Sequence, residues 1–239
     1  MKAYFLRRIG QPLILSDLPS LDLGKEAELE LYASAPLCDI DRRFTSVVLK
    51  KEAASSIIIW IQDKRYFPRL IISALVFLAA YVLASFLIRD PVPMIDEVLI
   101  GLAAGAAAWM IVSKNDAKAT VVKEKERKIN MAIDQAEVIV DESLKTLEEG
   151  YEKLFSYDLS TLSHMLSKGD LPRLETSPSL QAAAECYLNT YDKGMLKDLR
   201  KLDKTGNQKK AEAEFLHQAY TSTLDLYEMA FFYQILKDA

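Results

Sequence analysis

Two adjacent carboxylates, Asp96 and Glu97, are the residues in this chain best placed for chemistry, because they stand at the entrance of an apolar stretch. Carboxylates at the mouth of a membrane span attract cations, and a ring of them contributed by several chains would form an acidic pore entrance. In the first turn of a helix the same acids also interact favourably with the positive end of the helix dipole. The sequence leaves both roles open.

The other reactive side chains form no catalytic or metal-binding pattern. His164 and His217 are the only histidines, and neither has a cysteine or carboxylate at metal-ligand spacing. Cys38 and Cys186 are far apart in sequence, and we expect both to be reduced thiols. The sequence has no phosphate-binding glycine loop and no nucleophile elbow. We therefore expect no enzyme activity, no cofactor, no bound metal and no small-molecule substrate.

Two apolar stretches explain where the acidic pair lies. Leu70 to Ile88 has 19 residues without a formal charge, and as a helix it would cover about 28 Å, close to the thickness of the bilayer hydrocarbon. Val98 to Ser113 is shorter, but a helix that begins near Pro93 restores the length, since proline is tolerated in a first turn. Residues 66–114 are thus predicted to form a transmembrane helical hairpin, with spans at about 67–89 and 93–113.

Small residues on the second span predict a close helix contact. Gly101, Gly105 and Ala108 lie on a run of glycines and alanines, and such small-xxx-small patterns let two helix backbones approach each other in a membrane. This surface could pack against the first span of the same chain, or it could join copies of the chain.

Basic residues near the span ends predict the orientation. Lysines and arginines are frequent before the first span and after the second, whereas the connecting loop contains only Arg89. By the positive-inside rule both termini are expected in the cytoplasm, with the protein in the cell inner (plasma) membrane as a retained anchor. The aromatic residues Trp60, Tyr66, Phe67 and Trp109 are predicted at the cytoplasmic boundary of the spans.

Residues 1–65 are expected to form a small α+β element. Tyr4–Leu6, Leu13–Leu15 and Glu28–Tyr32 resemble short strands that are separated by glycine and proline. From Arg42 to Lys64 the pattern favours a helix that runs toward the membrane, although residues 55–61 are equally typical of a strand. Pro68 is predicted to mark the junction with the first span.

Residues 115–239 are expected to form a long helix followed by a helical bundle. No helix breaker occurs between Asn115 and Glu149, so the second span is predicted to continue as a rod with one apolar stripe. The stripe requires a partner, either the later helices or the same helix of a neighbouring subunit in a coiled coil. The stripe consists of Ile129, Ile133, Ala136, Val140, Leu144, Leu147, Tyr151 and Leu154.

Three further helices are predicted, over residues 160–166, 179–202 and 208–236. Gly169 and Pro172 end the first, Ser177 caps the second, and residues 204–207 form the turn before the third. The last helix is rich in aromatic residues. Tyr227, Phe231, Phe232 and Tyr233 are expected in the bundle core, and the alternative is a docking surface for another protein.

These features define the expected fold class as mainly α, with a two-helix transmembrane hairpin, a C-terminal cytoplasmic bundle and the small N-terminal element. The net charge of −4 argues against nucleic acid as a partner. We expect a membrane-anchored interaction or assembly subunit whose partners are the lipid bilayer and other subunits or copies of itself. An oligomeric ion channel or transport subunit, with Asp96 and Glu97 at its entrance, and a membrane-bound sensor or effector are the alternatives.

Overall fold

The structure is a computed structural model that describes residues 1–20, 28–87, 95–172, 174–202 and 225–236. Within this part the protein is mainly helical, with eight α-helices and one small sheet. The described residues form two compact units. The first unit consists of the described residues before Ala53 and after Asn130. The second, the hairpin unit, consists of those from Ala53 to Asn130.

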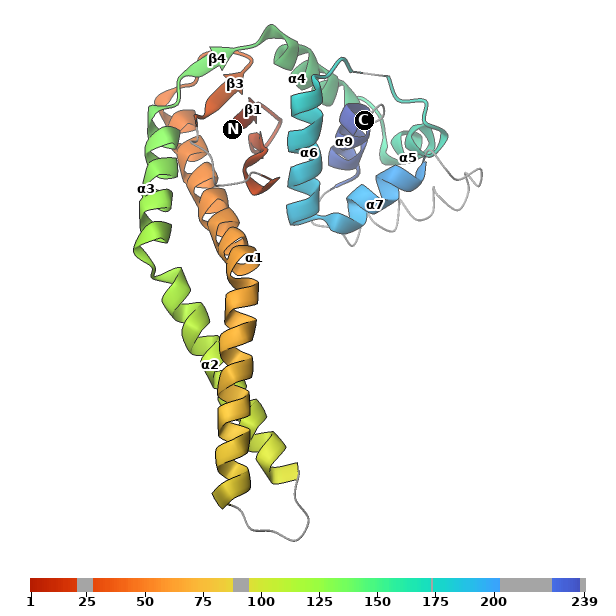
Figure 1. Cartoon of the computed structure of the whole chain (residues 1–239). Coiled ribbons are helices and arrows are strands. Elements are labelled where there is room, and N and C mark those ends of the chain that lie inside the picture. The colour runs from red at the N-terminus through yellow and green to blue at the C-terminus, as the bar shows by residue number, and fades with distance from the viewer. Residues whose placement is uncertain (21–27, 88–94, 173, 203–224, 237–239) are drawn as a thin grey trace. The chain divides into compact units, whose positions relative to one another are not determined.

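The sheet of the first unit combines strands from distant parts of the chain (Figure 1). Its order is β2-β1-β3-β4, with β1 at Lys2–Leu6, β2 at Leu13–Ser16, β3 at Glu30–Ala33 and β4 at Val138–Val140. β1 and β2 are antiparallel, whereas β3 pairs in parallel with both β1 and β4. The three strands expected near the N-terminus are therefore present, and β4 joins them from beyond the predicted hairpin.

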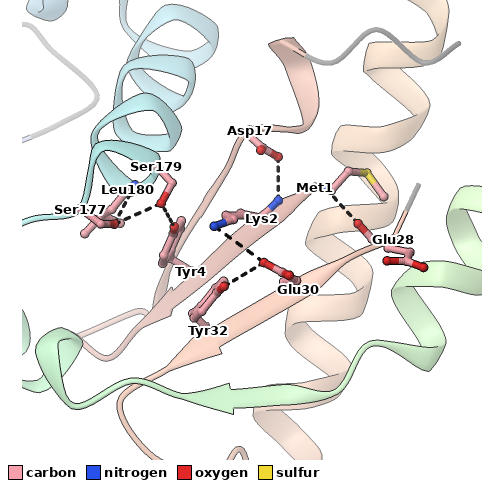
Figure 2. Close-up of polar contacts among 10 residues, drawn as sticks. All are labelled: Met1, Lys2, Tyr4, Asp17, Glu28, Glu30, Tyr32, Ser177, Ser179 and Leu180. Atoms are coloured by element: carbon pink, nitrogen blue, oxygen red, sulfur yellow. Dashed lines mark hydrogen bonds and ion pairs between the residues drawn. The ribbon is translucent and has the colours of Figure 1, made fainter. Parts of the chain in front are cut away.

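Polar contacts hold the beginning of the chain within this sheet (Figure 2). The Met1 amine donates to the Glu28 carbonyl oxygen at 2.8 Å, and the Lys2 amide donates to Asp17 Oδ1 at 2.9 Å. The Tyr4 hydroxyl donates to Ser179 Oγ at 2.7 Å, which links β1 to the first turn of helix α6. Strand and helix are thus joined by a hydrogen bond as well as by apolar packing.

Five helices pack with the sheet in this unit: α4 (Glu142–Leu154), α5 (Leu159–Lys168), α6 (Pro178–Tyr191), α7 (Lys193–Leu202) and α9 (Leu226–Leu236). Ser177 caps α6 as predicted, with its side chain accepting from the Leu180 amide. Gly169 ends α5 in the left-handed conformation, at φ 69°, which glycine adopts at little steric cost. The leucines and aromatic side chains of these helices form one core with Tyr4, Leu6, Leu13 and Leu15 of the sheet.

The predicted helix over 179–202 is wrong as a single element, because it divides into α6 and α7 at Asp192. This residue has φ −150° and ψ 78°, outside the helical region, and its Oδ1 accepts from the Met195 amide at 2.9 Å. A carboxylate at such a position starts a new helix by satisfying a free amide. The predicted turn at 204–207 and most of the predicted last helix, residues 208–224, lie outside the described residues.

The second unit consists of helix segments. α1 covers Asp39–Leu87, α2 covers Ile95–Ala117 and α3 covers Thr120–Gln135, and the boundaries between the units fall within α1 and α3. Residues 55–61 are helical, which decides between the two interpretations of that segment. The helix does not end at the predicted junction, because α1 continues through Pro68. An interior proline removes one backbone donor and its ring crowds the carbonyl oxygen four residues earlier, which kinks or breaks many helices.

The continuous rod expected from Asn115 to Glu149 is also wrong, because the chain leaves the helical conformation twice. A turn separates α2 from α3, with the Lys118 and Ala119 amides donating to the Asn115 and Asp116 carbonyl oxygens. The second break is β4, a run of Val138, Ile139 and Val140 whose branched side chains suit a strand. Pairing with β3 supplies this segment with backbone partners that a local pattern does not reveal.

Candidate membrane-interface site

Helices α1 and α2 are both long and apolar enough to cross a membrane. Their apolar side chains lie on the outside of the chain: Leu75 is 61% exposed, Phe86 79% and Ile111 60%. A core helix of a water-soluble domain would bury such side chains, because apolar surface is driven out of water. The outward-facing leucine, isoleucine and phenylalanine side chains are what a helix presents to lipid.

Small residues lie where α1 and α2 approach each other. Ser73 Oγ donates to the Gly105 carbonyl oxygen at 2.6 Å. A Cβ atom on Gly101 would lie 2.9 Å from Phe77 Cε2, closer than carbon atoms approach without strain. Gly101 and Gly105 therefore face α1 of the same chain, which corresponds to the intrachain alternative for the predicted packing surface. Ala108 is half-buried on the same helix.

An ion pair joins α1 to α2 where the apolar part of α1 begins and α2 approaches its last residue. Arg69, directly before the apolar part of α1, places its Nε 2.8 Å from Asp116 Oδ2 near the end of α2. The side chains are only 4% and 18% exposed, so the two charges largely compensate each other away from solvent. Tyr66 precedes Arg69 by three residues and Trp109 precedes Asp116 by seven. The rings of Tyr66 and Trp109 pack edge to face, with centroids 5.6 Å apart.

A cleft of about 330 Å³ opens beside the ion pair, between α1 and the segment that joins α2 to α3. One wall carries the Trp60 indole with the Lys64 ammonium 4.9 Å and the Lys125 ammonium 4.3 Å from the ring centroid. Cations at this distance from an indole are attracted by the electron-rich ring face. The cleft is lined by Trp60, Ile61, Lys64, Arg65, Pro68, Asp116, Ala119, Val121 and Val122.

Sequence reasoning missed this cleft. The sequence places Trp60 at the predicted cytoplasmic boundary of the spans and residues 115–149 in a predicted unbroken rod. The turn at residues 118–119 is what ends α2 and starts α3 separately. The only local indication in the sequence was the Trp60 to Lys64 spacing of four, which places an indole and an ammonium on one helix face.

The predicted acidic pair separates in the structure. Asp96 and Glu97 both occupy the first turn of α2, as expected for acids near the positive end of a helix dipole. Asp96 is exposed, whereas Glu97 is 4% exposed and makes a contact within the chain. Adjacent residues on a helix point about 100° apart, so the two carboxylates do not face the same direction.

The aromatic residues proposed for docking lie mostly in the core of the first unit. Phe231, Phe232 and Tyr233 are at most 4% exposed. Phe231 packs edge to face on Tyr151, and the partly buried Tyr227 stacks on Phe155 with centroids 4.4 Å apart. The core interpretation accounts for these rings, and a docking role for them stays a prediction.

Within the described part of the chain, the histidine and cysteine side chains do not gather at a site. His164 is exposed on α5, and His217 lies outside the described residues. Cys38 is exposed and Cys186 is buried, and both are free thiols. Among the described residues, no group of histidine, cysteine, aspartate and glutamate side chains could hold a metal ion.

A buried carboxylate in α1 is a second feature that the sequence did not indicate. Glu52 is 7% exposed; Ser16 Oγ donates to its Oε2 at 2.6 Å, and the Tyr191 hydroxyl donates to its Oε1 at 3.3 Å. Burial raises the pKa of Glu52, and the two hydrogen bonds oppose that shift. Burial and the neighbouring Glu52 charge raise the pKa of Tyr191 to about 12.

Comparisons with known proteins identify no relative of this chain. No family model matches the sequence, and neither a curated protein nor a solved structure was found that matches it.

Proposed function

We propose that this protein is an integral membrane protein in which α1 and α2 form a transmembrane hairpin and the first unit serves as an interaction or assembly subunit of a larger complex. The observation that carries this proposal is the outward exposure of the apolar side chains of both helices, from Leu70 to Leu87 and from Ile95 to Val112. In water that surface would be costly, whereas lipid covers it without penalty.

The topology of the sheet supports a hairpin with both flanks on one side of the membrane. β3 precedes the hairpin and β4 follows it, yet they pair in parallel, with Leu31 opposite Val138 and Ala33 opposite Val140. Strands cannot pair across a bilayer, because a ladder needs direct backbone contact at about 5 Å. One crossing would separate β3 from β4, and two crossings reunite them.

The distribution of cations supports a cytoplasmic position for this side. Lys64, Arg65 and Arg69 precede the apolar part of α1, and Lys114 and Lys118 follow that of α2. Such clusters next to span ends are retained in the cytoplasm during insertion.

An apolar stripe on α1, outside the apolar span, supports the interaction role. Ile40, Phe44 and Val47 recur at helical spacing and are 78%, 39% and 66% exposed. Residues at i, i+4 and i+7 share one helix face, and an exposed apolar face of this kind is typical of protein contact sites.

Cysteine labelling tests the topology. In a Cys186→Ala background, an impermeant maleimide is applied to intact cells and to inverted membrane vesicles. The native Cys38 is the first probe. Lys168→Cys and Asp96→Cys are the second and third probes, each made in a chain that also carries Cys38→Ser. We expect the probes at 38 and 168 to react only in inverted vesicles and the probe at 96 only in intact cells. Reaction of all three from one side would contradict the hairpin.

Affinity purification tests the interaction role. The tagged full chain is extracted in a mild detergent from its native host, and the mass and composition of the complex are determined. We expect stoichiometric recovery of other subunits with the parent chain and its loss in Ile40→Asp/Val47→Asp. The control Leu159→Asp, which replaces an exposed apolar side chain on α5, should keep it. A single species of several identical chains would instead favour the channel, and a monomer without partners would overturn the interaction role.

A further inference from the structure

The cleft at the charged end of the hairpin unit has the properties of a ligand site. Two cations, Lys64 and Arg65, line it, and the Lys125 ammonium contacts the same indole as Lys64. Asp116 is the single carboxylate of the lining, and Arg69 pairs with it at 2.8 Å. The charge that remains is positive, so the cleft favours an anion.

Arg65 strengthens this charge because its guanidinium is uncommitted. It is exposed, and within the described part of the chain no ion pair or hydrogen bond involves it. A guanidinium presents several N–H donors in a fork whose geometry matches the oxygens of a phosphate group. Lys64 and Arg65 both line the cleft, so an anion inside it lies near both cations.

The rest of the lining is apolar. Ile61, Pro68, Val121 and Val122 face the cleft together with the indole of Trp60. A small hydrated anion gains nothing from such walls, whereas an amphiphile can place carbon atoms against them while its anionic group meets the cations.

The position of the cleft along α1 agrees with the headgroup layer of a membrane. Arg65 precedes Leu70, where the apolar run begins, by five residues, or about 8 Å of helix. The polar layer on each side of a bilayer is about 5–8 Å thick. If the hairpin crosses the membrane, Pro68 lies next to the hydrocarbon and Arg65 lies at the depth of lipid phosphates.

From these observations we infer that the cleft binds the phosphate-bearing headgroup of an anionic phospholipid. The phosphate meets Lys64 and Arg65, and the glycerol backbone and the upper acyl chain lie against Pro68, Val121 and Val122. Asp116, whose charge is compensated by Arg69, completes the lining. This inference rests on the proposed membrane location and adds a lipid class to it.

Tryptophan fluorescence tests the inference. Trp60 and Trp109 are the only tryptophans, so Trp109→Phe leaves Trp60 in the cleft wall as the sole reporter. The full chain in neutral detergent is titrated with mixed micelles that contain either phosphatidylglycerol or phosphatidylcholine. We expect a saturable change in Trp60 emission with phosphatidylglycerol and none with phosphatidylcholine.

Two variants with matched charge separate a site from general attraction. Lys64→Gln/Arg65→Gln and Lys114→Gln/Lys118→Gln each remove two positive charges from the same end of the hairpin, but only the first pair lines the cleft. All four side chains are exposed, so both variants should fold, which circular dichroism verifies. We expect the cleft variant to lose about tenfold more affinity than the control, because general attraction acts on both pairs alike.

Three results would overturn the inference. Equal losses in the two variants would mean surface attraction without a site, and equal binding of phosphatidylcholine would mean that no anionic headgroup is selected. Equally tight binding of soluble glycerol phosphate would assign the cleft to a free phosphate compound. Because micelle binding does not require a membrane crossing, failure of the hairpin topology in the labelling experiment remains distinguishable from failure of this site.

Discussion

The backbone amide of Asp141 donates a hydrogen bond to the carbonyl oxygen of Ala33 at 2.9 Å. This contact extends the pairing of β3 with β4 by one residue and joins segments that lie on opposite sides of the hairpin in the sequence. Asp141 also caps α4, since its Oδ1 accepts from the Ser143 amide at 2.9 Å. One residue thus ends the strand and starts the helix whose leucines enter the core.

Substitutions of Asp141 should separate these two roles. Asp141→Asn keeps an acceptor and should leave stability nearly unchanged, whereas Asp141→Ala should cost about 1 kcal/mol through loss of the cap. Asp141→Pro should cost more, because it also removes the amide that bonds to Ala33. Thermal unfolding of the purified chain, followed by circular dichroism, gives the ranking. Equal melting temperatures for the alanine and asparagine variants would contradict the capping role.

The contact between α1 and α2 predicts a strong size limit at Gly105. A Cβ atom there would already lie 3.3 Å from the Ser73 carbonyl oxygen and from Phe77 Cβ, so Gly105→Leu forces the helices apart. We expect a loss of about 1–3 kcal/mol, the usual cost of overpacking. Ala106→Leu is the control, because Ala106 is exposed on the same helix.

Intrinsic fluorescence provides the measurement for the Gly105 variants, since both tryptophans of the chain lie in the hairpin unit. The unfolding midpoint of Gly105→Leu should fall while that of Ala106→Leu stays near the parent value. If both variants behaved alike, the glycine would not be limited by contact with α1.

The ion pair of Arg69 with Asp116 predicts non-additive substitutions. Asp116→Leu leaves the Arg69 guanidinium, whose side chain is 4% exposed, without its counter-charge, and should cost about 2 kcal/mol. Arg69→Met/Asp116→Leu removes both charges and should be less destabilised than Asp116→Leu alone. A double-mutant cycle of unfolding midpoints in detergent measures the coupling. Additive losses would show that the two charges do not stabilise each other.

The raised pKa of the buried Glu52 carboxyl predicts that the free energy of unfolding decreases as the pH rises. Its folded-state pKa lies above the ordinary value of 4.5 because of burial, so the native state holds the proton more tightly than the unfolded chain does. The free energy of unfolding therefore falls from pH 4.5 upward until the folded-state pKa is passed, and is then constant. Glu52→Gln removes this loss while keeping an acceptor for Ser16.

Melting temperatures measured from pH 4 to pH 8 check this prediction. The melting temperature of Glu52→Gln, relative to that of the parent, should increase as the pH rises from 4.5 to the folded-state pKa of Glu52. Glu149→Gln, which replaces an exposed glutamate on α4, is the control and should show no such growth. A constant difference between Glu52→Gln and the parent would mean that ionisation of Glu52 is not responsible.

Local patterns in the sequence predicted much of this fold because they depend on neighbouring residues. The three N-terminal strands alternate with glycine and proline, and Ser177 and Gly169 limit their helices through contacts within a few residues. The apolar runs on α1 and α2 were equally visible, because length and composition alone define a helix that can cross a membrane. Less of the candidate site was visible, since the aromatic and basic residues near the span ends were identified but the cleft that some of them line was not.

The amino-acid sequence by itself determined the two apolar helices, their charged flanks and the small residues between them, since these follow from composition and spacing. Only the tertiary structure decided that Val138–Val140 leaves the helical pattern to pair with β3, that Glu52 becomes a buried carboxylate, and that Lys125 reaches the indole of Trp60. The physical reason is that each of these depends on a partner at least 36 residues away in the chain. Such contacts form only when the chain closes a long loop, and a short window of sequence carries no record of them.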